Sequence, residues 1–448
     1  MSVRVLRPGA SVLSLCLFSS FGGSIGQAAP QGSQSATTLT LTLKQAVQIA
    51  LKQNPRQAVA QLLAQQSTRD SQIARSPLLP QVRLGASAAL DQYNFQTVER
   101  LPEPKPAGPF QHVEGGTFFS QTLLNVPLIR RYQIGREGIV EANANEKTSR
   151  EDTTAAVVAQ YLLVLKAIAD YEATAARVAL AERLYKQAFE LQKTGVALSI
   201  DVVRANVQLQ IERQALIRAD TDTRTTRYRL AELLDLPREQ EPQVADHFEF
   251  FDLPTFDRDA SITRALSVRP EMKAIAAETR IAELSRKSAS EERLPQLEFA
   301  GFWSYQGEHF NDSIPSYSYA ASLSVPLFVG GRIHAEIERQ KLVEQQVDEN
   351  RKALEARIVR EVKTAIDELE SARTAVDVAN AALELANEEV AQAQRRFQAG
   401  VTTNVEVIEA QTALAVASDN QVEALYVFNQ SRANLAHAMG EIENTYTR

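Results

Sequence analysis

The sequence predicts a mainly helical fold with a smaller β component, made of two copies of one unit that joins long helices to two strands. Three observations predict this fold. Short motifs recur in the same order in both halves, and each half has segments whose apolar residues alternate as they do in strands. A 3.5-residue apolar repeat also runs through a long segment that has no proline or glycine.

The matched motifs set the expected boundaries of the two copies. Four pairs of segments match: 50–55 with 265–270, 79–82 with 294–297, 126–128 with 325–327, and 195–202 with 400–407. We therefore expect a linker at 29–41, a first repeat at 42–235, an inter-repeat linker at 236–259, a second repeat at 260–440 and a tail at 441–448.

Each repeat is expected to contain a helix, two strands, a very long helix, a tip turn and a further helix. In the first repeat the strands cover about 81–91 and 117–127, and the later helices cover 130–193 and 197–235. In the second repeat the strands cover about 296–306 and 317–328, and the helices cover 332–397 and 402–440. Helices this long would reach roughly 95–100 Å, which no compact domain needs.

The apolar pattern of the second long helix is typical of coiled coils. Its seam alternates large and small residues: Val362, Ala365, Leu369, Ala372, Val376, Ala379, Leu383, Ala386, Val390, Ala393 and Phe397. Small residues in such a seam let neighbouring helices approach closely. An autonomous fibrous coiled coil would share this pattern, but it would not explain the strands in both halves.

The predicted strands carry aromatic residues near their ends. Trp303, Tyr305, Tyr317 and Tyr319 would suit the girdle of a membrane β-barrel, and about ten residues per strand suits a tilted spanning strand. A half-buried sheet in a soluble domain would show the same alternation. Four strands cannot close a barrel, and open sheet edges are not tolerated in lipid. If the strands span, three chains would form a 12-stranded trimeric β-barrel, four strands per chain, continuous with an α-helical barrel.

Composition excludes several classes of protein. The chain has 448 residues, of which 44% are hydrophobic and 23% charged, so it is expected to be neither disordered nor a polytopic helical membrane protein. A net charge of −7 argues against a nucleic-acid partner. Five scattered His and one Cys predict no metal site, and no cofactor is expected.

The N-terminus has the features of an export signal. Arg4 and Arg7 precede an uncharged apolar stretch at 11–21, and small residues follow. We expect a signal peptide at 1–28. No apolar run beyond residue 30 is expected to form a transmembrane helix, so the mature chain is either soluble in the periplasm or an outer-membrane β-barrel.

The only cysteine offers a second interpretation of the N-terminus. Cys16 lies inside the apolar stretch and would anchor the chain if it were lipidated. Leu15 is large where lipoprotein cleavage requires a small residue, which favours ordinary cleavage. The mature chain would then contain no cysteine.

The sequence resembles the TolC-like outer-membrane efflux proteins over nearly the whole mature chain. Four motifs carry the resemblance: Leu43 to Pro55, Leu78 to Val82, Ser324 to Arg332, and Arg396 to Gly400 running on to Gln411. The resemblance implies a homotrimer in outer-membrane lipid with a helical tunnel across the periplasm. An inner-membrane transporter and a periplasmic adaptor (membrane fusion) protein would be its partners.

The resemblance also gives roles to the turns between paired helices. These turns would be periplasmic tips that dock the adaptor through Thr194, Gly195, Val196, Ser199, Gly400 and Val401. Gly195 and Gly400 can take positive φ, which turns that end helices favour. The alternative is that both are simply helical-hairpin turns.

Two acidic residues match the family's inward-facing acidic rings. Glu406 and Glu409 are three residues apart and share a helix face, so a trimer would place six carboxylates at a narrow entrance. The first repeat has Asp201, which we group with the acidic rings, and Arg204, which we group with the gate residues, at the equivalent sites. A solvated acidic helix face is the alternative.

The sequence departs from the family at the latch that closes the tips. Phe397 and Thr402 replace a Tyr and an Arg, Ile200 replaces a Thr, and only Asp201 remains. We expect closure to depend on packing of Phe397 and on other polar links, because Phe397 cannot hydrogen-bond.

The leading prediction is therefore a passive exit duct of a tripartite efflux or type I secretion system. The alternative is a soluble periplasmic coiled-coil adaptor or scaffold. An enzyme is not expected, because the sequence has no phosphate-binding loop, zinc-ligand spacing or nucleophile motif.

Overall fold

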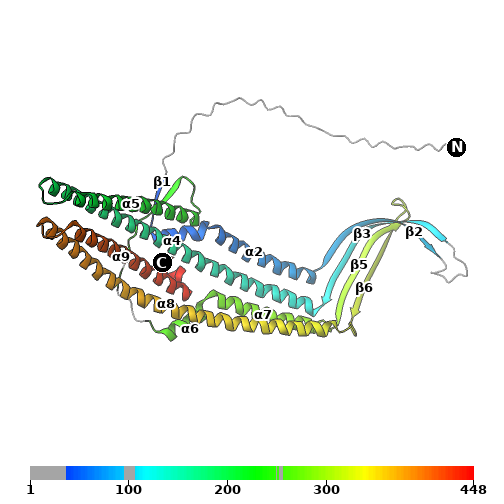
Figure 1. Ribbon diagram of the computed structural model, residues 1–448. Coiled ribbons are helices and arrows are strands. Elements are labelled where there is room, and N and C mark those ends of the chain that lie inside the picture. The colour runs from blue at the N-terminus through cyan, green and yellow to red at the C-terminus, as the bar shows by residue number, and fades with distance from the viewer. Residues whose placement is uncertain (1–36, 95–105, 249, 252–255, 448) are drawn as a thin grey trace, which may run out of the picture.

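The computed structural model describes residues 37–94, 106–248, 250–251 and 256–447. The molecule is elongated, with a β-sheet at one end and the tips of two helical hairpins at the other (Figure 1). The predicted signal peptide and Cys16 lie outside the described residues.

The helices of the two halves have nearly equal lengths. The first half contains α1 (Leu43–Gln53), α2 (Pro55–Arg75), α4 (Val126–Lys193) and α5 (Ser199–Leu233), of 11, 21, 68 and 35 residues. The second half contains α6 (Arg258–Val268), α7 (Pro270–Glu291), α8 (Arg332–Gln398) and α9 (Asn404–Ala438), of 11, 22, 67 and 35 residues. A 3₁₀ turn, η1 (Ser76–Leu78), follows α2.

The first long helix begins earlier than the expected residue 130. It starts at Val126 because Asn125 caps it, accepting a hydrogen bond from the Leu128 backbone N–H at 3.1 Å. Pro127 occupies the first turn, where its missing N–H costs no helical hydrogen bond. A single residue therefore separates α4 from the preceding strand.

The large sheet is antiparallel and has the order β2–β3–β5–β6. Its strands are β2 (Gln81–Asn94), β3 (Pro106–Leu124), β5 (Gln296–Gly307) and β6 (Ile314–Ser324). β3 starts well before the expected residue 117 because it pairs with β2 as far as Asn94 opposite Pro106. β6 stops before the expected residue 328, since its last partner is Gln296 opposite Ser324 and Pro326, which lacks an N–H, follows.

The connection from β6 to α8 differs from the one at α4. Residues 325–331 separate the two elements, and Gly330 and Gly331 have φ of 62° and 81°. These positive values favour glycine, and no heavy atom lies within 4 Å of a Cβ built at either position.

Two segments expected as linkers, and the tail, contain regular structure. β1 (Thr37–Leu41) pairs in parallel with β4 (Gln240–Val244), and α10 (Ile442–Thr447) lies in the expected tail. The buried Tyr161 of α4 donates its hydroxyl hydrogen to the Leu41 carbonyl, 2.9 Å away, and lies 2.8 Å from Asp246. This contact attaches the small sheet to the long helix.

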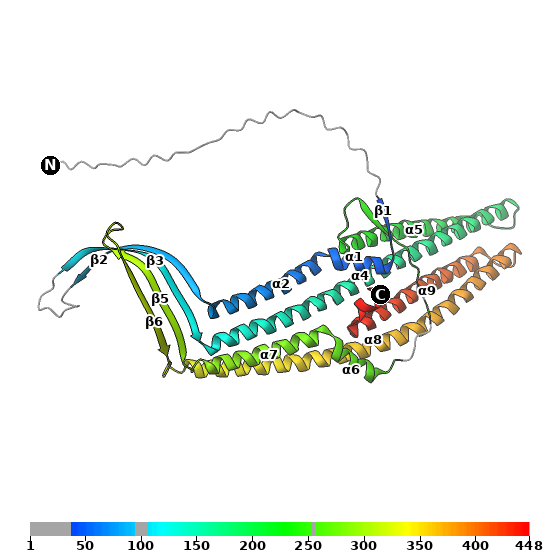
Figure 2. The ribbon, with the colours of Figure 1, turned by 180° about the vertical axis from the view of Figure 1, so that it is seen from behind.

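The helices form one curved layer. Near the sheet the order of packing is α2, α4, α7, α8, and near the tips it is α5, α4, α9, α8. Figure 2 shows the same order from behind. One edge of the layer is formed by α2 and α5, and the other by α8 along its whole length.

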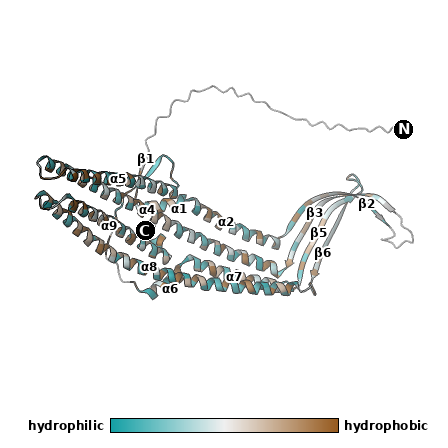
Figure 3. Ribbon diagram, in the orientation of Figure 1, coloured by the Kyte–Doolittle hydropathy of each residue, from teal (hydrophilic) through white to brown (hydrophobic). Residues whose placement is uncertain are grey.

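The core lies along the seams between these helices. One cluster surrounds Val157, Tyr161 and Leu165 of α4, and another surrounds Ile358, Val362 and Leu369 of α8. Along the helices, hydrophobic and hydrophilic residues alternate over short distances (Figure 3).

Among the described residues, one helix is long and apolar enough to cross a membrane, whereas the sequence predicted none beyond residue 30. A window of α4 has a mean hydropathy of 1.3, and 56% of that window is buried inside the chain. Val157, Val158, Tyr161 and Val164 of α4 are all fully buried in the first core cluster. The apolar character of α4 is therefore explained by packing in the core.

Candidate functional site at the hairpin tips

Both hairpins end in turns of the same geometry, at residues 194–198 and 399–403, which we call the hairpin tips. In the first, the Val196 N–H donates to the Leu191 carbonyl at 2.9 Å. In the second, the Val401 N–H donates to the Arg396 carbonyl at 3.0 Å. Gly195 and Gly400 take φ of 77° and 67°, as the Schellman motif requires.

The two tips touch within one chain. The Asn404 side-chain amide donates to the Asp201 carbonyl at 2.9 Å, and Asn404 is only 3% exposed. A Cβ built on Gly400 would lie 3.9 Å from Cγ1 of Val196. The tips are therefore level with each other and joined by a buried hydrogen bond.

An apolar cluster lies directly above the tips. Its buried members come from both hairpins: Leu184, Val390, Ala393, Phe397, Val407 and Ala410. Phe397 is 5% exposed, and partly buried Leu180, Leu191 and Ala197 of the first hairpin cover the cluster. Phe397 thus sits where separation of the hairpins would expose it to water.

The acidic pair of the second tip has two different environments. Glu406 accepts a hydrogen bond from the Thr402 hydroxyl and lies 3.0 Å from Nε of Arg396. Glu409 is exposed. Thr402, one of the residues that differ from the family's latch, therefore holds Glu406, and Arg396 offsets part of the Glu406 charge.

Asp201 differs from its expected place in an acidic ring. It is 6% exposed, and its carboxylate accepts a hydrogen bond at 3.1 Å from the Leu198 backbone N–H in the first turn of α5. Arg204 lies 3.9 Å from the same carboxylate. A carboxylate at the start of a helix satisfies free N–H groups there, so Asp201 acts as a cap rather than as an exposed ring member.

The remaining tip residues are exposed. Ile200, Val196 and Val401 are 47%, 57% and 70% exposed. Thr194, Gly195, Ser199 and Gly400 are exposed too. The docking role that the resemblance implies for these residues stays a prediction.

At the opposite end, the four aromatic residues share one face of the sheet. Trp303 pairs with Tyr317 and Gly301 with Tyr319, so both tyrosines lie on the face of Trp303. Tyr305 follows two residues after Trp303, and the two rings meet edge to face with their centroids 5.4 Å apart. All four are 47–71% exposed.

A charged contact that the sequence did not predict links three helices midway along the hairpins. Arg177 of α4 lies 3.2 Å from Glu212 of α5 and 2.8 Å from Asp419 of α9. Its third contact is Thr174, at 3.0 Å. No local motif marks these residues, because their partners are far away in the sequence.

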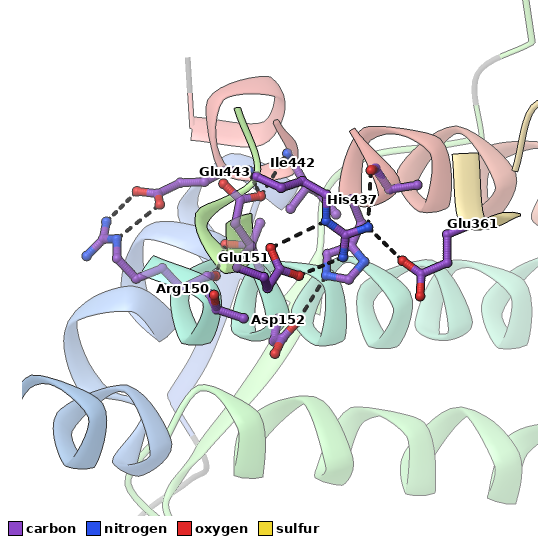
Figure 4. A network of polar contacts seen from close by, with 12 residues as sticks. Arg150, Glu151, Asp152, Glu361, His437, Ile442 and Glu443 are labelled. Carbon is purple, nitrogen blue, oxygen red and sulfur yellow. Dashed lines mark hydrogen bonds and ion pairs between the residues drawn. The ribbon is translucent and has the colours of Figure 1, made fainter. Parts of the chain in front are cut away.

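A second unpredicted contact, which we call the C-terminal clasp, attaches α10 to α4. Figure 4 shows Glu151 beneath the backbone of Ile442 and Glu443, whose N–H groups donate to its carboxylate at 3.0 and 3.3 Å. Arg150 forms a two-pronged ion pair with Glu443. Burial raises the pKa of Glu151 above its ordinary value, and the nearby Glu443 carboxylate adds to the shift.

The other half of this network holds the end of α9. His437 lies 3.0 Å from Asp152 (Figure 4). Arg269 lies 2.6 Å from both Glu271 and Glu361. Arg269 also donates to the Ala438 carbonyl at 3.4 Å. Asn54 occupies the position in the first repeat that Arg269 occupies in the second. Its side-chain amide donates to the Leu233 carbonyl at 2.9 Å, which is the equivalent bond. The repeat therefore contained the signal for this pair of contacts.

Comparison with known proteins identifies the family. The model of the outer membrane efflux protein family matches residues 46–235 and 261–441. Because this match covers most of the sequence, the chain belongs to the outer membrane efflux protein family.

Two named relatives give the range of similarity. The pyoverdine export outer membrane protein OpmQ of Pseudomonas aeruginosa is 26% identical over 257 residues, which are 55% of this chain and 52% of that protein. The match therefore spans about half of the OpmQ length. Outer membrane protein TolC of Salmonella enteritidis is 19% identical over 390 residues, covering 82% of this chain and 76% of TolC.

Solved structures show the same fold. The CmeC outer membrane channel of Campylobacter jejuni superposes with a TM-score of 0.77 at 17% identity, covering 89% of this chain and 86% of that one. The outer membrane protein VceC of Vibrio cholerae gives a TM-score of 0.75 at 16% identity, covering 89% and 96%.

Proposed function

We propose that the chain is one third of a passive export duct in the outer membrane. The observation that carries this proposal is a four-stranded sheet with two open edges, joined to helices of 68 and 67 residues. Helices of that length reach about 100 Å, far beyond the sheet. An arrangement of this kind suits a conduit that starts in a membrane and continues through an aqueous compartment.

The open sheet is the reason for three copies. The outer edges of β2 and β6 would leave backbone N–H and C=O groups unsatisfied in lipid. Three chains would supply twelve strands and close the barrel, and the exposed Trp303, Tyr305, Tyr317 and Tyr319 would face the lipid interface. The near-equal helix lengths of the two halves support an internal repeat, which would give the tube approximate six-fold symmetry.

The hairpin tips form the proposed entrance. The exposed tip residues would dock a periplasmic adaptor, and an inner-membrane transporter would supply energy and substrate. Relatives named for export and for channels support this placement in an export system. The duct itself would catalyse no reaction, because its role is to provide a path.

Localisation and conductance test the proposal together. The full-length chain, expressed in a Gram-negative host, should sediment with outer membranes, require detergent for extraction and have three times the chain mass by native mass spectrometry. Inserted into planar bilayers, it should produce discrete conductance steps. Recovery as a monomer in the soluble periplasmic fraction would instead support a coiled-coil adaptor and contradict the duct.

A further inference from the structure

The two faces of the large sheet differ in charge. Residues directly opposite each other on paired strands share a face, and the four exposed aromatic residues described above define what we call the girdle face. Every Asp, Glu, Lys and Arg among the described residues of these four strands lies on the other face, which we call the polar face: Arg83, Asp91, Glu114 and Glu298. In the proposed duct, the girdle face would meet lipid and the polar face would line the lumen.

One row of the polar face combines a cation with two aromatic rings. Arg83 of β2 lies opposite Phe118 of β3, which in turn lies opposite Phe302 of β5. The Arg83 guanidinium is 5.0 Å from the centroid of the Phe118 ring, and the two phenyl centroids are 6.2 Å apart. A Cβ built on Gly85 would lie 3.2 Å from the Phe118 ring, so glycine at this position gives the ring room.

A hollow of about 670 Å³ lies on this row. The Arg83 side chain and the two phenyl rings line it, together with the short side chains of Ser120 and Ser318. Both rings are half-buried, whereas Arg83 is exposed. The hollow therefore presents aromatic surface, a guanidinium and two hydroxyls to the same space.

The charge of Arg83 is not neutralised by the strands around it. Glu298 and Glu114 each lie four residues along their strands from the Arg83 row, on opposite sides of it, which corresponds to roughly 13 Å. Glu114 is bound instead to Ser304 and Gln306, at 2.9 Å from each. Within the described strands, no carboxylate pairs with Arg83, so its guanidinium is available to an anion in the hollow.

We propose that this hollow is a transit site for aromatic carboxylates. The inference rests on the proposed duct and adds a class of substrate to it. The ring of the ligand would lie against Phe118 and Phe302 in the offset or edge-to-face arrangement that aromatic pairs prefer. Its carboxylate would accept two parallel hydrogen bonds from the Arg83 fork.

The acidic residues on either side of the row narrow the class of ligand. They would repel a molecule that carries several separated negative charges, and they would tolerate a compact monoanion whose charge stays beside Arg83. Because the hollow is open to the lumen, such a ligand would be held briefly and then released, as passage through a duct requires.

Block of the single-channel current in planar bilayers tests the site. 1-Naphthoate should interrupt the current, and cyclohexanecarboxylate, which has the same charge but no aromatic ring, should interrupt it less. Arg83→Gln should weaken the block by 1-naphthoate about ten-fold, because it removes charge-assisted hydrogen bonds. Phe118→Leu and Phe302→Leu should each weaken it about three-fold and leave the block by cyclohexanecarboxylate unchanged.

Phe119→Leu is the matched control. Phe119 is the next residue of β3, but it lies on the girdle face, where its ring meets Phe299 edge to face at 5.7 Å. Its replacement should leave the block by both anions unchanged.

The outcomes separate the site from the duct. If Arg83→Gln weakened the block by both anions equally and neither Phe118→Leu nor Phe302→Leu changed it, Arg83 would act only through its field. That result would overturn the site and leave the duct standing. A chain that gives no conductance steps in potassium chloride alone would contradict the duct and the site together.

Discussion

Asn404 shows what a single residue adds at the tips. It lies at the first position of α9, where the equivalent residue of the first half is Ser199. Its amide is the buried polar link between the hairpins, and Phe397 is the buried apolar one. We expect closure of the tips to depend on both, on the packing of Phe397 and on the hydrogen bond of Asn404.

Replacing Asn404 tests that link. Asn404→Ala removes the donor and leaves the Asp201 carbonyl without it, at a cost of about 1 kcal/mol to the closed arrangement. That cost should raise the open-to-closed ratio in planar bilayers about five-fold.

Asn387→Ala is the control for this variant. Asn387 is an exposed residue of α8 whose amide bonds only to the Leu383 carbonyl of its own helix. Its removal should leave the ratio unchanged. Equal effects of the two variants would show that the bond between the hairpins does not hold the tips closed.

Much of the tip could be predicted from single residues, and some could not. Gly195 and Gly400 marked the helix ends correctly, because positive φ is a local requirement. Asp201 was wrongly placed in an exposed ring, since its capping bond and burial depend on neighbours in space. The contact of Asn404 with Asp201 joins residues from different halves, so no local pattern announces it.

At the scale of elements, α10 is the clearest case of structure that the sequence concealed. Six residues are too few for a helical period to emerge, and the same holds for the five-residue strands β1 and β4. The range predicted for β3 was too short because Pro106, Gly108 and Pro109, which lie in the strand, are typical of turns. The long helices were predicted closely, since a pattern sustained over many turns has few alternatives.

The C-terminal clasp should respond to pH through Glu151. Because the folded-state pKa of Glu151 is raised above 4.5, the folded chain binds this proton more tightly than the unfolded chain does. Protonation therefore adds stability that is fully present below about pH 4.5, the unfolded pKa, and that is lost as the pH rises through the folded pKa.

Glu151→Gln keeps an acceptor for the backbone of Ile442 and Glu443 but removes the titration. Relative to the unmodified chain, the variant should be more thermally stable near neutral pH, and the difference should shrink as the pH falls. Melting curves recorded in parallel at each pH measure this difference in thermal stability. Glu349→Gln, on an exposed face of α8, is the control. A difference that grows on acidification would contradict this account.

At the scale of the whole molecule, the charge at the entrance follows from the tips of three copies in the proposed trimer. Glu406 is offset by Arg396, whereas Glu409 is exposed. Glu409→Gln should therefore lower cation selectivity more than Glu406→Gln does, and replacing both with Ala should lower it most. Reversal potentials in asymmetric salt measure the selectivity, and block by multivalent cations should weaken in parallel. Unaltered selectivity in the double variant would mean that these carboxylates do not line the path.

The junctions that join the sheet to the two long helices, α4 and α8, differ in length and in hydrogen bonding. Asn125 alone joins β3 to α4. Its side-chain oxygen accepts from the Leu128 backbone N–H, and its side-chain nitrogen donates to the Gln296 side chain. Seven residues that include Gly330 and Gly331 join β6 to α8. In a ring of three copies, three rigid couplings would alternate with three compliant ones. A twist applied to the helices would then reach the barrel through the α4 junctions and be absorbed at the α8 junctions, so that movement at the tips need not distort the barrel.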